Sequence, residues 1–356
     1  VLLEDLTKIS ALGLGDVLRQ YFTFRKIFFN ALVDCRAWQP DLIILIDSPA
    51  FNLRFAKQIK KEFPVVYYIS PQFWAWGKRR ISVVKKFVDK MLVILPFEAQ
   101  MYDEAGVDCE FVGNPLLDSL PDPEKIDRTE LRNRFEIGPD QLAIGLLSGS
   151  RKREVTRILP LMLKSAVEMR KRISNAVFFV THAPNIDKQI YDEIITKFPD
   201  LAIRRLDLPK RKAFHDLVAA LDFALITSGT ATLEAALIGT PFFLLYKAAW
   251  STYFLGRQLI RVPYLGLVNL LSGKRVVPEF IQRDIRPVTI AHEARVLLEH
   301  REFYEGMKNE FRQVREGLGE KGASGRAAKS VLEFLSSNKS SQTGRGTLSA
   351  SHSTSA

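Results

Sequence analysis

A short turn of small residues at 228–232 has the composition of an anion-binding site. Its residues Ser228, Gly229, Thr230, Ala231 and Thr232 follow the apolar run 223–226 and open a segment of helical periodicity. Such a turn leaves backbone N–H groups unpaired at a helix start, where the helix dipole also favours an anion. Glu234 stands about one turn further on, within reach of a sugar next to that anion. The segment therefore predicts a site for a phosphate linked to a sugar, as in a nucleotide sugar.

A second turn of the same kind is formed by Ser148, Gly149 and Ser150, which follow the apolar run 142–147. Arg151 comes next and supplies a cation suited to phosphate. Taken alone, the turn is equally well explained as an ordinary helix start with a serine N-cap. Because two such turns occur in the same half of the chain, we expect them to grip one diphosphate from two sides, with Arg151 neutralising its charge.

Asp47 directly follows the apolar run 42–46 and precedes Ser48 and Pro49. In a parallel sheet, ligands bind outside the carboxyl ends of the strands, so a carboxylate here is a candidate general base that takes a proton from an acceptor hydroxyl. Asp is also a common N-cap, and a helix is expected to begin near Phe51. The residue pattern leaves both interpretations open.

Aromatic and basic residues are interleaved in two places. The loop 70–77 contains Trp74 and Trp76 and is followed by a basic run that includes Arg79; the segment 11–29 contains Phe22, Arg25 and Phe28. This composition is typical of surfaces that meet an anionic amphiphile or a membrane interface. The alternative is that these aromatic side chains pack in the core and the basic ones are solvated.

The elements that position these residues alternate along the chain. Continuous apolar runs at 42–46, 65–69, 91–95, 142–147, 177–180, 223–226 and 242–245 predict buried strands, and segments such as 155–169, 191–198 and 214–221 have helical periodicity. Strands that are apolar throughout, rather than alternating, are typical of parallel sheets covered on both faces. The predicted fold class is therefore α/β, with two Rossmann-like parallel-sheet domains facing a cleft.

Proline and acidic residues divide the chain. We expect a first domain at 1–115, a linker at 116–127, a donor-binding domain at 128–287 and C-terminal helices at 288–336 that pack back toward the first domain. Residues 337–356 are rich in Ser, Thr and Gly and predict a disordered tail. The chain opens with Val1 inside a pattern and has no leader, so it is expected to begin within a longer protein.

Charge and cysteine content narrow the function. The 356 residues carry a formal net charge of +11 and a pI of about 9.5, which predicts an anionic partner: nucleic acid, anionic lipid or a phosphorylated substrate. Nucleic acid is the least favoured, because no nucleic-acid motif accompanies the dispersed basic residues. The two cysteines have no metal-site spacing and fit a reducing cytosol. No apolar run reaches the roughly 18–20 residues of a membrane span.

Together these residues resemble one family, the lipid-A-disaccharide synthases of Gram-negative bacteria, which are inverting glycosyltransferases of the GT-B fold. The resemblance covers roughly residues 5 to 335, and Ser-Pro-x-x-Trp-Ala-Trp is its most specific motif. The matching pieces are Leu45-Ile-Asp-Ser-Pro-Ala-Phe-Asn52, Ile69-Ser-Pro-Gln-Phe-Trp-Ala-Trp76, Leu95-Pro-Phe-Glu98, Phe111-Val-Gly-Asn-Pro115, Leu147-Ser-Gly-Ser-Arg151, Ser228-Gly-Thr-Ala-Thr-Leu-Glu234 and Asn269-Leu-Leu-Ser-Gly273.

The resemblance implies a reaction that joins UDP-2,3-diacylglucosamine to 2,3-diacylglucosamine 1-phosphate, giving lipid A disaccharide 1-phosphate and UDP. It implies Asp47 as the base, Arg151 and the two turns as the diphosphate site, Glu234 at the ribose and Asn269 lining the cleft. The loop 70–77, which contains Trp74 and Trp76, and residues 11–29 would contact the acyl chains at the inner membrane surface. No cofactor or metal is expected. The resemblance also implies a cytoplasmic protein that is peripheral at the inner membrane and forms a homodimer.

The chain departs from the family at three points. An opening Gly-Glu-x-Ser-Gly-Asp section is absent, so the first domain is expected to be incomplete. Asn114 stands where the family usually has His, and Ala50 where it has an acidic residue, so any role of those side chains is lost or moved. Two alternatives follow: another UDP-GlcNAc enzyme of the same fold, such as a peptidoglycan GlcNAc transferase or an epimerase, or a UDP-binding protein without transfer activity.

Overall fold

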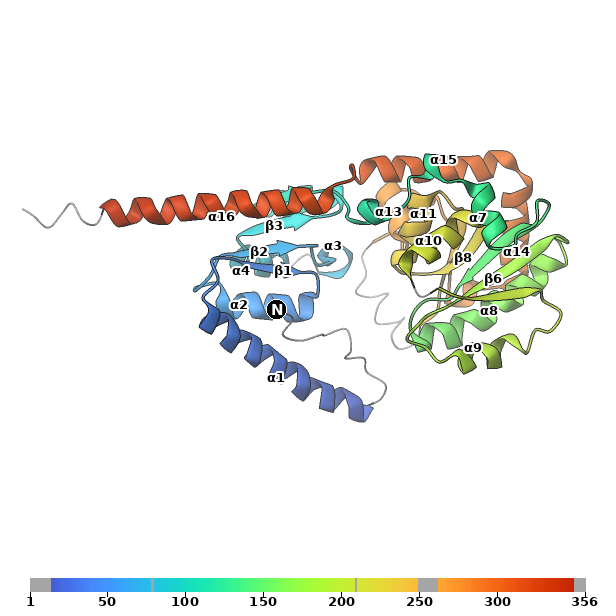
Figure 1. Ribbon diagram of the computed structural model, residues 1–356, viewed down its shortest axis with the longest axis horizontal. Helices are drawn as coiled ribbons and strands as arrows, with labels where there is room; N and C mark the ends of the chain where they lie inside the picture. Colours follow the sequence, from blue (N-terminus) through green and yellow to red (C-terminus); the bar gives the residue numbers. More distant parts are fainter. Residues whose placement is uncertain (1–13, 78–79, 209, 249–261, 349–356) are drawn as a thin grey trace, which may run out of the picture. The chain divides into compact units, whose positions relative to one another are not determined.

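The protein is described here by a computed structural model that covers residues 14–77, 80–208, 210–248 and 262–348. It divides into two compact α/β units (Figure 1). Unit 1 comprises residues 1–113 and 322–356, and unit 2 comprises residues 114–321. Each unit is built on its own parallel sheet, so the predicted fold class is confirmed.

Unit 1 contains a four-stranded parallel sheet of order β1-β2-β3-β4. The strands are β1 (Ile43–Ile46), β2 (Val65–Tyr68), β3 (Lys90–Val93) and β4 (Cys109–Phe111); the helices are α1 (Leu14–Trp38), α2 (Pro49–Ile59), α3 (Phe73–Trp76), α4 (Ile81–Phe87), α5 (Pro96–Glu104) and α16 (Ala323–Leu348). Parallel neighbours require crossover connections, and α2, α4 and α5 supply them.

Both faces of this sheet are covered. Tyr67 and Met91 face a core cluster to which α1, α2, α4 and α5 contribute. On the other face, Val66 and Leu92 pack with Ala327 of α16. The C-terminal helix therefore returns to unit 1 and completes its sandwich, as Figure 1 shows for the red helix α16 beside β3.

Unit 2 contains a six-stranded parallel sheet of order β10-β9-β8-β5-β6-β7. The strands are β5 (Leu142–Leu147), β6 (Ala176–His182), β7 (Ile203–Asp207), β8 (Phe223–Thr227), β9 (Phe242–Tyr246) and β10 (Glu279–Ile281). The helices are α6 (Leu116–Ser119), α7 (Arg128–Arg134), α8 (Lys152–Arg170), α9 (Lys188–Ile195), α10 (Arg211–Ala220), α11 (Thr230–Ile238), α13 (Leu267–Ser272), α14 (Pro287–Glu299) and α15 (Arg301–Gly317).

The strand order of unit 2 reverses between β5 and β8. From β5 the chain adds β6 and β7 on one side, and then crosses back to add β8, β9 and β10 on the other. Such a reversal is a topological switch point, where the two loops that leave the carboxyl ends of the neighbouring strands diverge and leave room for a ligand. The two predicted anion-binding turns are the loops that follow β5 and β8.

Every apolar run that the sequence analysis assigned to a strand forms one, and three further strands were missed: β4, β7 and β10. All three lie at a sheet edge, where polar residues such as Arg204 and Glu279 interrupt the apolar pattern. The composition predicted a disordered tail from Ser337, whereas α16 continues to Leu348. None of the described helices is both long and apolar enough to cross a membrane.

Candidate functional site

The two small-residue turns lie next to each other in unit 2, because β5 and β8 are paired in parallel with Leu147 opposite Ile226. A cavity of about 570 Å³ opens at this point, and we call it the switch-point cavity. Its lining includes seven predicted site residues: Gly149, Ser150, Arg151, Ser228, Gly229, Thr230 and Ala231. The sequence analysis thus identified residues on both sides of this cavity, although they come from segments about 80 residues apart.

The turn at the start of α11 presents free donors to the cavity. Among the described residues, no acceptor bonds the backbone N–H groups of Gly229, Thr230 and Ala231. The neighbouring donors are used internally, since Ser228 N–H bonds Leu245 O at 3.2 Å and the Thr232 hydroxyl donates to Gly229 O at 2.7 Å. This helix start therefore has the unpaired N–H groups and the positive dipole end that an anion requires.

The turn at the start of α8 is already occupied by a carboxylate. Glu154 Oε2 accepts the N–H groups of Ser150 and Arg151 at 3.2 and 3.3 Å, and Glu154 Oε1 accepts from Arg151 Nη1 at 2.6 Å. Glu154 thus takes the donors and the cation that we assigned to a phosphate. An anionic ligand at this turn has to compete with Glu154 for them.

Gly149 is required by this turn. Its φ is +97°, a conformation that side chains disfavour. A Cβ atom at this position would lie 2.4 Å from Glu154 Oε2 and 2.7 Å from Thr227 Cγ2. The turn that follows β5 therefore depends on glycine for both its backbone conformation and its close packing.

Sequence reasoning missed Arg211, which lies on α10 and lines the cavity. Its guanidinium lies over the Phe214 ring at 4.6 Å and forms a two-point ion pair with the buried Glu234, with Nε 2.9 Å from Oε1. His215 Nε2 lies 3.2 Å from the same carboxylate. Glu234 therefore holds Arg211 rather than lining the cavity itself. The basic run 210–212 ahead of a helix was the available signal.

His182 is a further residue that lines the cavity. It is buried at the end of β6; its Nδ1 lies 3.1 Å from Asp207 Oδ1, and its Nε2 lies 2.6 Å from Ile186 O. Both partners are acceptors, so the two bonds form together only when the ring carries two protons. All three possible cations of the cavity, this ring included, are thus paired with carboxylates of the protein.

The remaining donor-side residues lie away from the cavity lining. Ser148 and Thr232 are buried behind the two turns. Asn269 lies in α13, where its side-chain nitrogen donates to Val277 O and Glu279 Oε1 at 2.8 Å and its oxygen accepts from Val277 N–H at 2.7 Å. The amide of Asn269 therefore fixes the connection to β10.

Asp47 lies at the carboxyl end of β1 in unit 1 and is exposed. The N-cap position of α2 belongs to Ser48, and no side-chain cap bond forms there. The Asp47 carboxylate accepts no hydrogen bond from the described residues, while its backbone carbonyl accepts from Asn52 at 2.7 Å. The capping explanation for Asp47 therefore lacks support, and its carboxylate faces solvent at the strand end.

The backbone along this edge of unit 1 is strained. Asp47, Ser48 and Ile69 have φ values of 48°, 43° and 66°. A left-handed conformation is rare for a β-branched residue such as Ile69, and strain of this kind costs roughly 1–3 kcal/mol per residue. Such outliers concentrate at functional sites, so the ends of β1 and β2 are candidates on backbone geometry as well as on side-chain type.

A buried carboxylic acid stands beside this edge and was given no role by the sequence analysis. Glu98, on α5, accepts from the Ser70 hydroxyl at 2.6 Å, the Trp74 indole N–H at 3.0 Å and the Leu95 backbone N–H at 3.3 Å. Burial raises the pKa of Glu98 to about 7, although these hydrogen bonds oppose the rise. Its only sequence signal was its place in the Leu95–Glu98 motif.

The residues predicted to face the acceptor differ in their burial and in whether the structure describes them. Trp74 is half-buried and packs edge-on against Phe97 with ring centroids 5.3 Å apart, whereas Arg79 and the side chain of Trp76 lie outside the described residues. On α1, Phe22 and Arg25 are exposed. Phe28 instead packs against the rings of Phe51 and Phe55 at 5.4 and 6.0 Å, in the core of unit 1.

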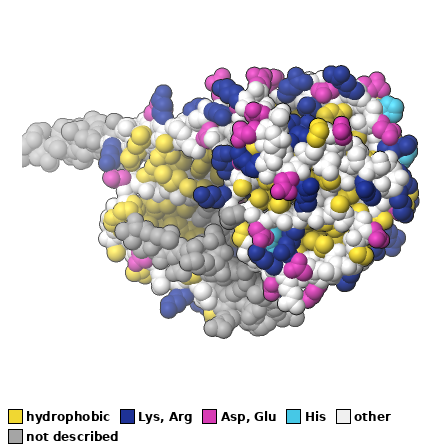
Figure 2. All heavy atoms as spheres, turned by 45° about the vertical axis from the view of Figure 1, so that its right-hand side comes forward, with side chains coloured by type: hydrophobic (Ala, Val, Ile, Leu, Met, Phe, Trp, Pro, Cys, Tyr) yellow, Lys and Arg dark blue, Asp and Glu magenta, His cyan; other side chains and the backbone are white. Residues whose placement is uncertain are grey.

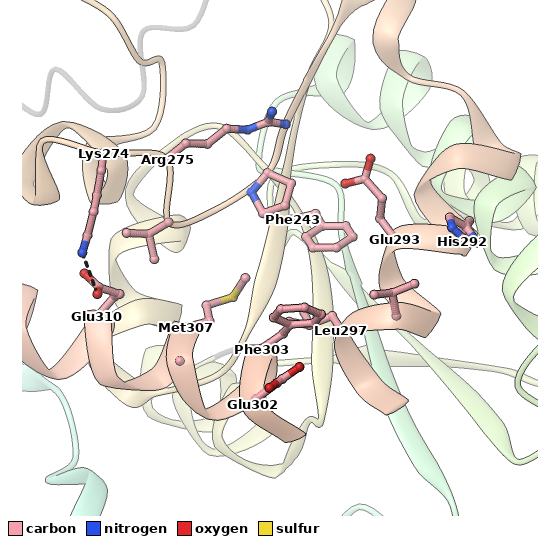
Figure 3. Close-up of a pocket in the computed structure, with 14 residues that line it drawn as sticks. Phe243, Lys274, Arg275, His292, Glu293, Leu297, Glu302, Phe303, Met307 and Glu310 are labelled. Atoms are coloured by element: carbon pink, nitrogen blue, oxygen red, sulfur yellow. Dashed lines mark hydrogen bonds and ion pairs between the residues drawn. The ribbon is translucent and has the colours of Figure 1, made fainter. Parts of the chain in front are cut away.

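Unit 2 has a second cavity, of about 620 Å³, between α14, α15 and the sheet (Figure 3). Phe243, Leu297 and Met307 form apolar parts of its wall, and Lys274 Nζ pairs with Glu310 at 2.8 Å at its margin. The described residues that line it include none of the predicted site residues. Since the switch-point cavity gathers both predicted anion-binding turns, it is the better candidate for an anionic ligand.

Charges on the visible face of unit 2 are mixed, with Lys and Arg side chains interspersed among Asp and Glu (Figure 2). The formal charge of +11 is therefore not gathered into one basic stripe on this face. On this face, as in the switch-point cavity, basic side chains lie among acidic ones.

Comparison with known proteins identifies the family. The family model described as lipid-A-disaccharide synthetase matches residues 1–332. The chain belongs to this family. The synthase of Syntrophus aciditrophicus is 41% identical over 332 residues, covering 93% of this chain and 85% of that protein. The synthase of Myxococcus xanthus is 38% identical over 335 residues, covering 94% and 86%. The predicted family resemblance is therefore confirmed.

More distant proteins of known structure share the fold of this chain. UDP-GlcNAc 2-epimerase from Neisseria meningitidis, bound to UDP-GlcNAc, aligns with a TM-score of 0.60 at 13% identity, covering 92% of this chain and 84% of that one. The epimerase from Methanocaldococcus jannaschii aligns with a TM-score of 0.53 at 12% identity, with the same coverage. At these identities the likeness concerns the fold alone.

The geometry of the β5 turn leads to a prediction about stability. Gly149→Ala should lower the free energy of unfolding by about 1–3 kcal/mol, because the new Cβ meets two side chains and the backbone is held at positive φ. Gly306→Ala is the matched control. Gly306 lies inside α15 with no atom near a new Cβ, so this change should raise stability by about 0.5–1 kcal/mol. Urea denaturation measures both; equal effects would contradict the turn's dependence on Gly149.

Proposed function

We propose that this protein is an inverting glycosyltransferase that joins UDP-2,3-diacylglucosamine to 2,3-diacylglucosamine 1-phosphate. The products are lipid A disaccharide 1-phosphate and UDP. The observation that carries this proposal is family membership over residues 1–332. It is supported by a cavity that gathers both small-residue turns at the switch point of a parallel sheet.

On the donor side, the diphosphate of the nucleotide binds across the two turns. The free N–H groups of Gly229, Thr230 and Ala231 receive one phosphate, and the start of α8 with Arg151 receives the other. Ser148, Gly149, Ser150, Ser228 and Thr232 shape these turns from within. Glu234, which the sequence analysis expected at the ribose, instead places Arg211 against the nucleotide through its ion pair. Asn269 acts indirectly, by fixing the chain near β10.

On the acceptor side, Asp47 is the general base. It takes the proton of the acceptor 6-hydroxyl as that oxygen attacks the anomeric carbon of the donor. The bond from this carbon to the diphosphate oxygen breaks, and UDP leaves with the bonding electron pair. Attack from the face opposite UDP inverts the anomeric configuration. The N–H groups and Arg151 stabilise the charge that develops on the leaving diphosphate.

The acylated substrates require contact with a lipid surface. The loop with Trp74 and Trp76, the neighbouring Arg79, and Phe22 and Arg25 on α1 are the candidates for this contact. Aromatic and basic residues together favour the interface of an anionic membrane. We therefore propose that the protein works at the cytoplasmic face of the inner membrane as a peripheral enzyme.

The role of Asp47 is tested by Asp47→Asn. Loss of a general base typically lowers turnover by about 10²–10⁴-fold, while UDP binding should stay within about twofold of wild type. The assay measures transfer between the two diacyl substrates, with UDP affinity measured by calorimetry and Asp103→Asn, an exposed change on α5, as control. Transfer within about tenfold of wild type would exclude Asp47 as the base. Turnover of UDP-GlcNAc alone would instead indicate an epimerase.

The competition at the α8 turn gives a second prediction. Glu154→Gln should raise UDP affinity by about three- to tenfold, because it removes the charge that occupies the helix start and Arg151. Arg151→Ala should lower affinity instead. Glu168→Gln, on the same helix and paired with Lys171 outside the cavity, is the control and should change nothing. Weaker UDP binding by Glu154→Gln would mean that the carboxylate positions Arg151 for the ligand.

Membrane contact is tested by vesicle sedimentation. Arg25→Ser should lower partitioning to anionic vesicles by about fivefold, since one basic residue near such a surface contributes about 1 kcal/mol. Phe22→Ser should also lower it. The control is Phe303→Ser in unit 2, because Phe303 is 53% exposed and Phe22 is 60% exposed. An equal loss for all three variants would argue against a contact made by α1.

A further inference from the structure

Glu98 joins three segments at the carboxyl edge of the sheet of unit 1. Oε1 accepts from Ser70, which directly follows the strained Ile69, and from Trp74 in α3. Oε2 accepts from the N–H of Leu95, where α5 begins. One carboxylate therefore links the end of β2, the aromatic loop and the end of β3.

This arrangement is costly for a purely structural role. Glu98 is buried, and the described residues give it no ionic partner, so a well-packed apolar residue would fill the same space without the desolvation cost. Each of its three bonds is donated to it, which is the pattern that an ionised carboxylate satisfies. The fold therefore keeps an ionisable carboxyl group at this position, although a buried apolar residue would avoid the desolvation cost.

We propose that Glu98 is a positioning residue for the aromatic loop 70–77, and that its ionised form holds Ser70 and Trp74 in the geometry that receives the lipid acceptor. This inference rests on the proposed function for the identity of the acceptor. Glu98 itself acts through Ser70 and Trp74, without touching the reacting atoms. The strained backbone of Ile69 needs such a restraint, because a residue in an unfavourable conformation relaxes when the contacts that hold it are lost.

The pKa of Glu98 gives this restraint a pH dependence. Burial raises it from 4.5 to about 7, so the stability that the buried neutral acid contributes is present below about 4.5 and is lost as pH rises through about 7. The ionised form, which holds the loop, gains population over the same range. The titratable groups that face it are Tyr102 on α5 and Cys109 on β4, whose pKa values are both raised by burial; that of Cys109 reaches about 12. Of these three groups, Glu98 is the one whose pKa lies near neutrality.

The decisive variant is Glu98→Gln. Its amide oxygen still accepts from Ser70 and Trp74, but its NH2 group then meets the Leu95 N–H, donor against donor. We expect the KM for the acceptor to rise about tenfold, with UDP affinity unchanged within about twofold. The fall of acceptor KM through pH 7 in the wild type should disappear in Glu98→Gln and persist in Glu98→Asp. Glu104→Gln, exposed on the same helix, is the control.

A second readout does not depend on turnover. Trp74 emission should change with a midpoint near pH 7 in the wild-type protein, and the change should vanish in Glu98→Gln and in Trp74→Phe but remain in Trp38→Phe, whose indole is 83% exposed. A change that survives in Trp74→Phe, or an acceptor KM with the wild-type pH profile in Glu98→Gln, would overturn the inference. If no transfer is found at all, the proposed function fails, and the fluorescence still decides the role of Glu98.

Discussion

The parallel pairing of β5 with β8 is the constraint on which the donor site depends. Neither turn makes a binding site alone, because each offers only a few N–H groups at one helix start. Pairing in register places the two strand ends side by side, so both helix starts border one cavity. The chain reaches this arrangement by reversing its strand order, and that reversal also leaves the space between the diverging loops.

Local chemistry was readable from the sequence, whereas pairing was not. The small-residue turns at 148–150 and 228–232 follow apolar runs, so their strand–turn–helix context could be predicted from periodicity and composition. That β5 lies next to β8 rather than β9 is set by long-range packing, which no single segment encodes. The edge strands β4, β7 and β10 were missed for a related reason: a strand paired on one side needs less apolar surface, and Arg204 in β7 obscures its pattern.

The residues that sequence reasoning missed act through partners far away in the chain. Arg211 was given no role from the sequence, and the fold brings it to Glu234, 23 positions further along the chain. Glu98 was given no role from the sequence; it caps α5, and its two other bonds reach back to Ser70 and Trp74. Conversely, Phe28 had the pattern of an interfacial residue and packs with Phe51 and Phe55, because helix periodicity does not say which aromatic faces the core.

Ion pairs within the protein determine what an anionic ligand meets in the switch-point cavity. Arg151 and Arg211 would repel one another across this cavity, and each instead has a carboxylate partner, Glu154 or Glu234. An anionic ligand has to displace these carboxylates from their cationic partners. Its net affinity is therefore smaller than its own contacts alone would give. At the start of α11 the N–H groups of Gly229, Thr230 and Ala231 have no acceptor among the described residues, whereas at the start of α8 Glu154 accepts two N–H groups. In the proposed function, the nucleotide is therefore anchored first at α11, and the exchange of ion pairs takes place on the α8 side.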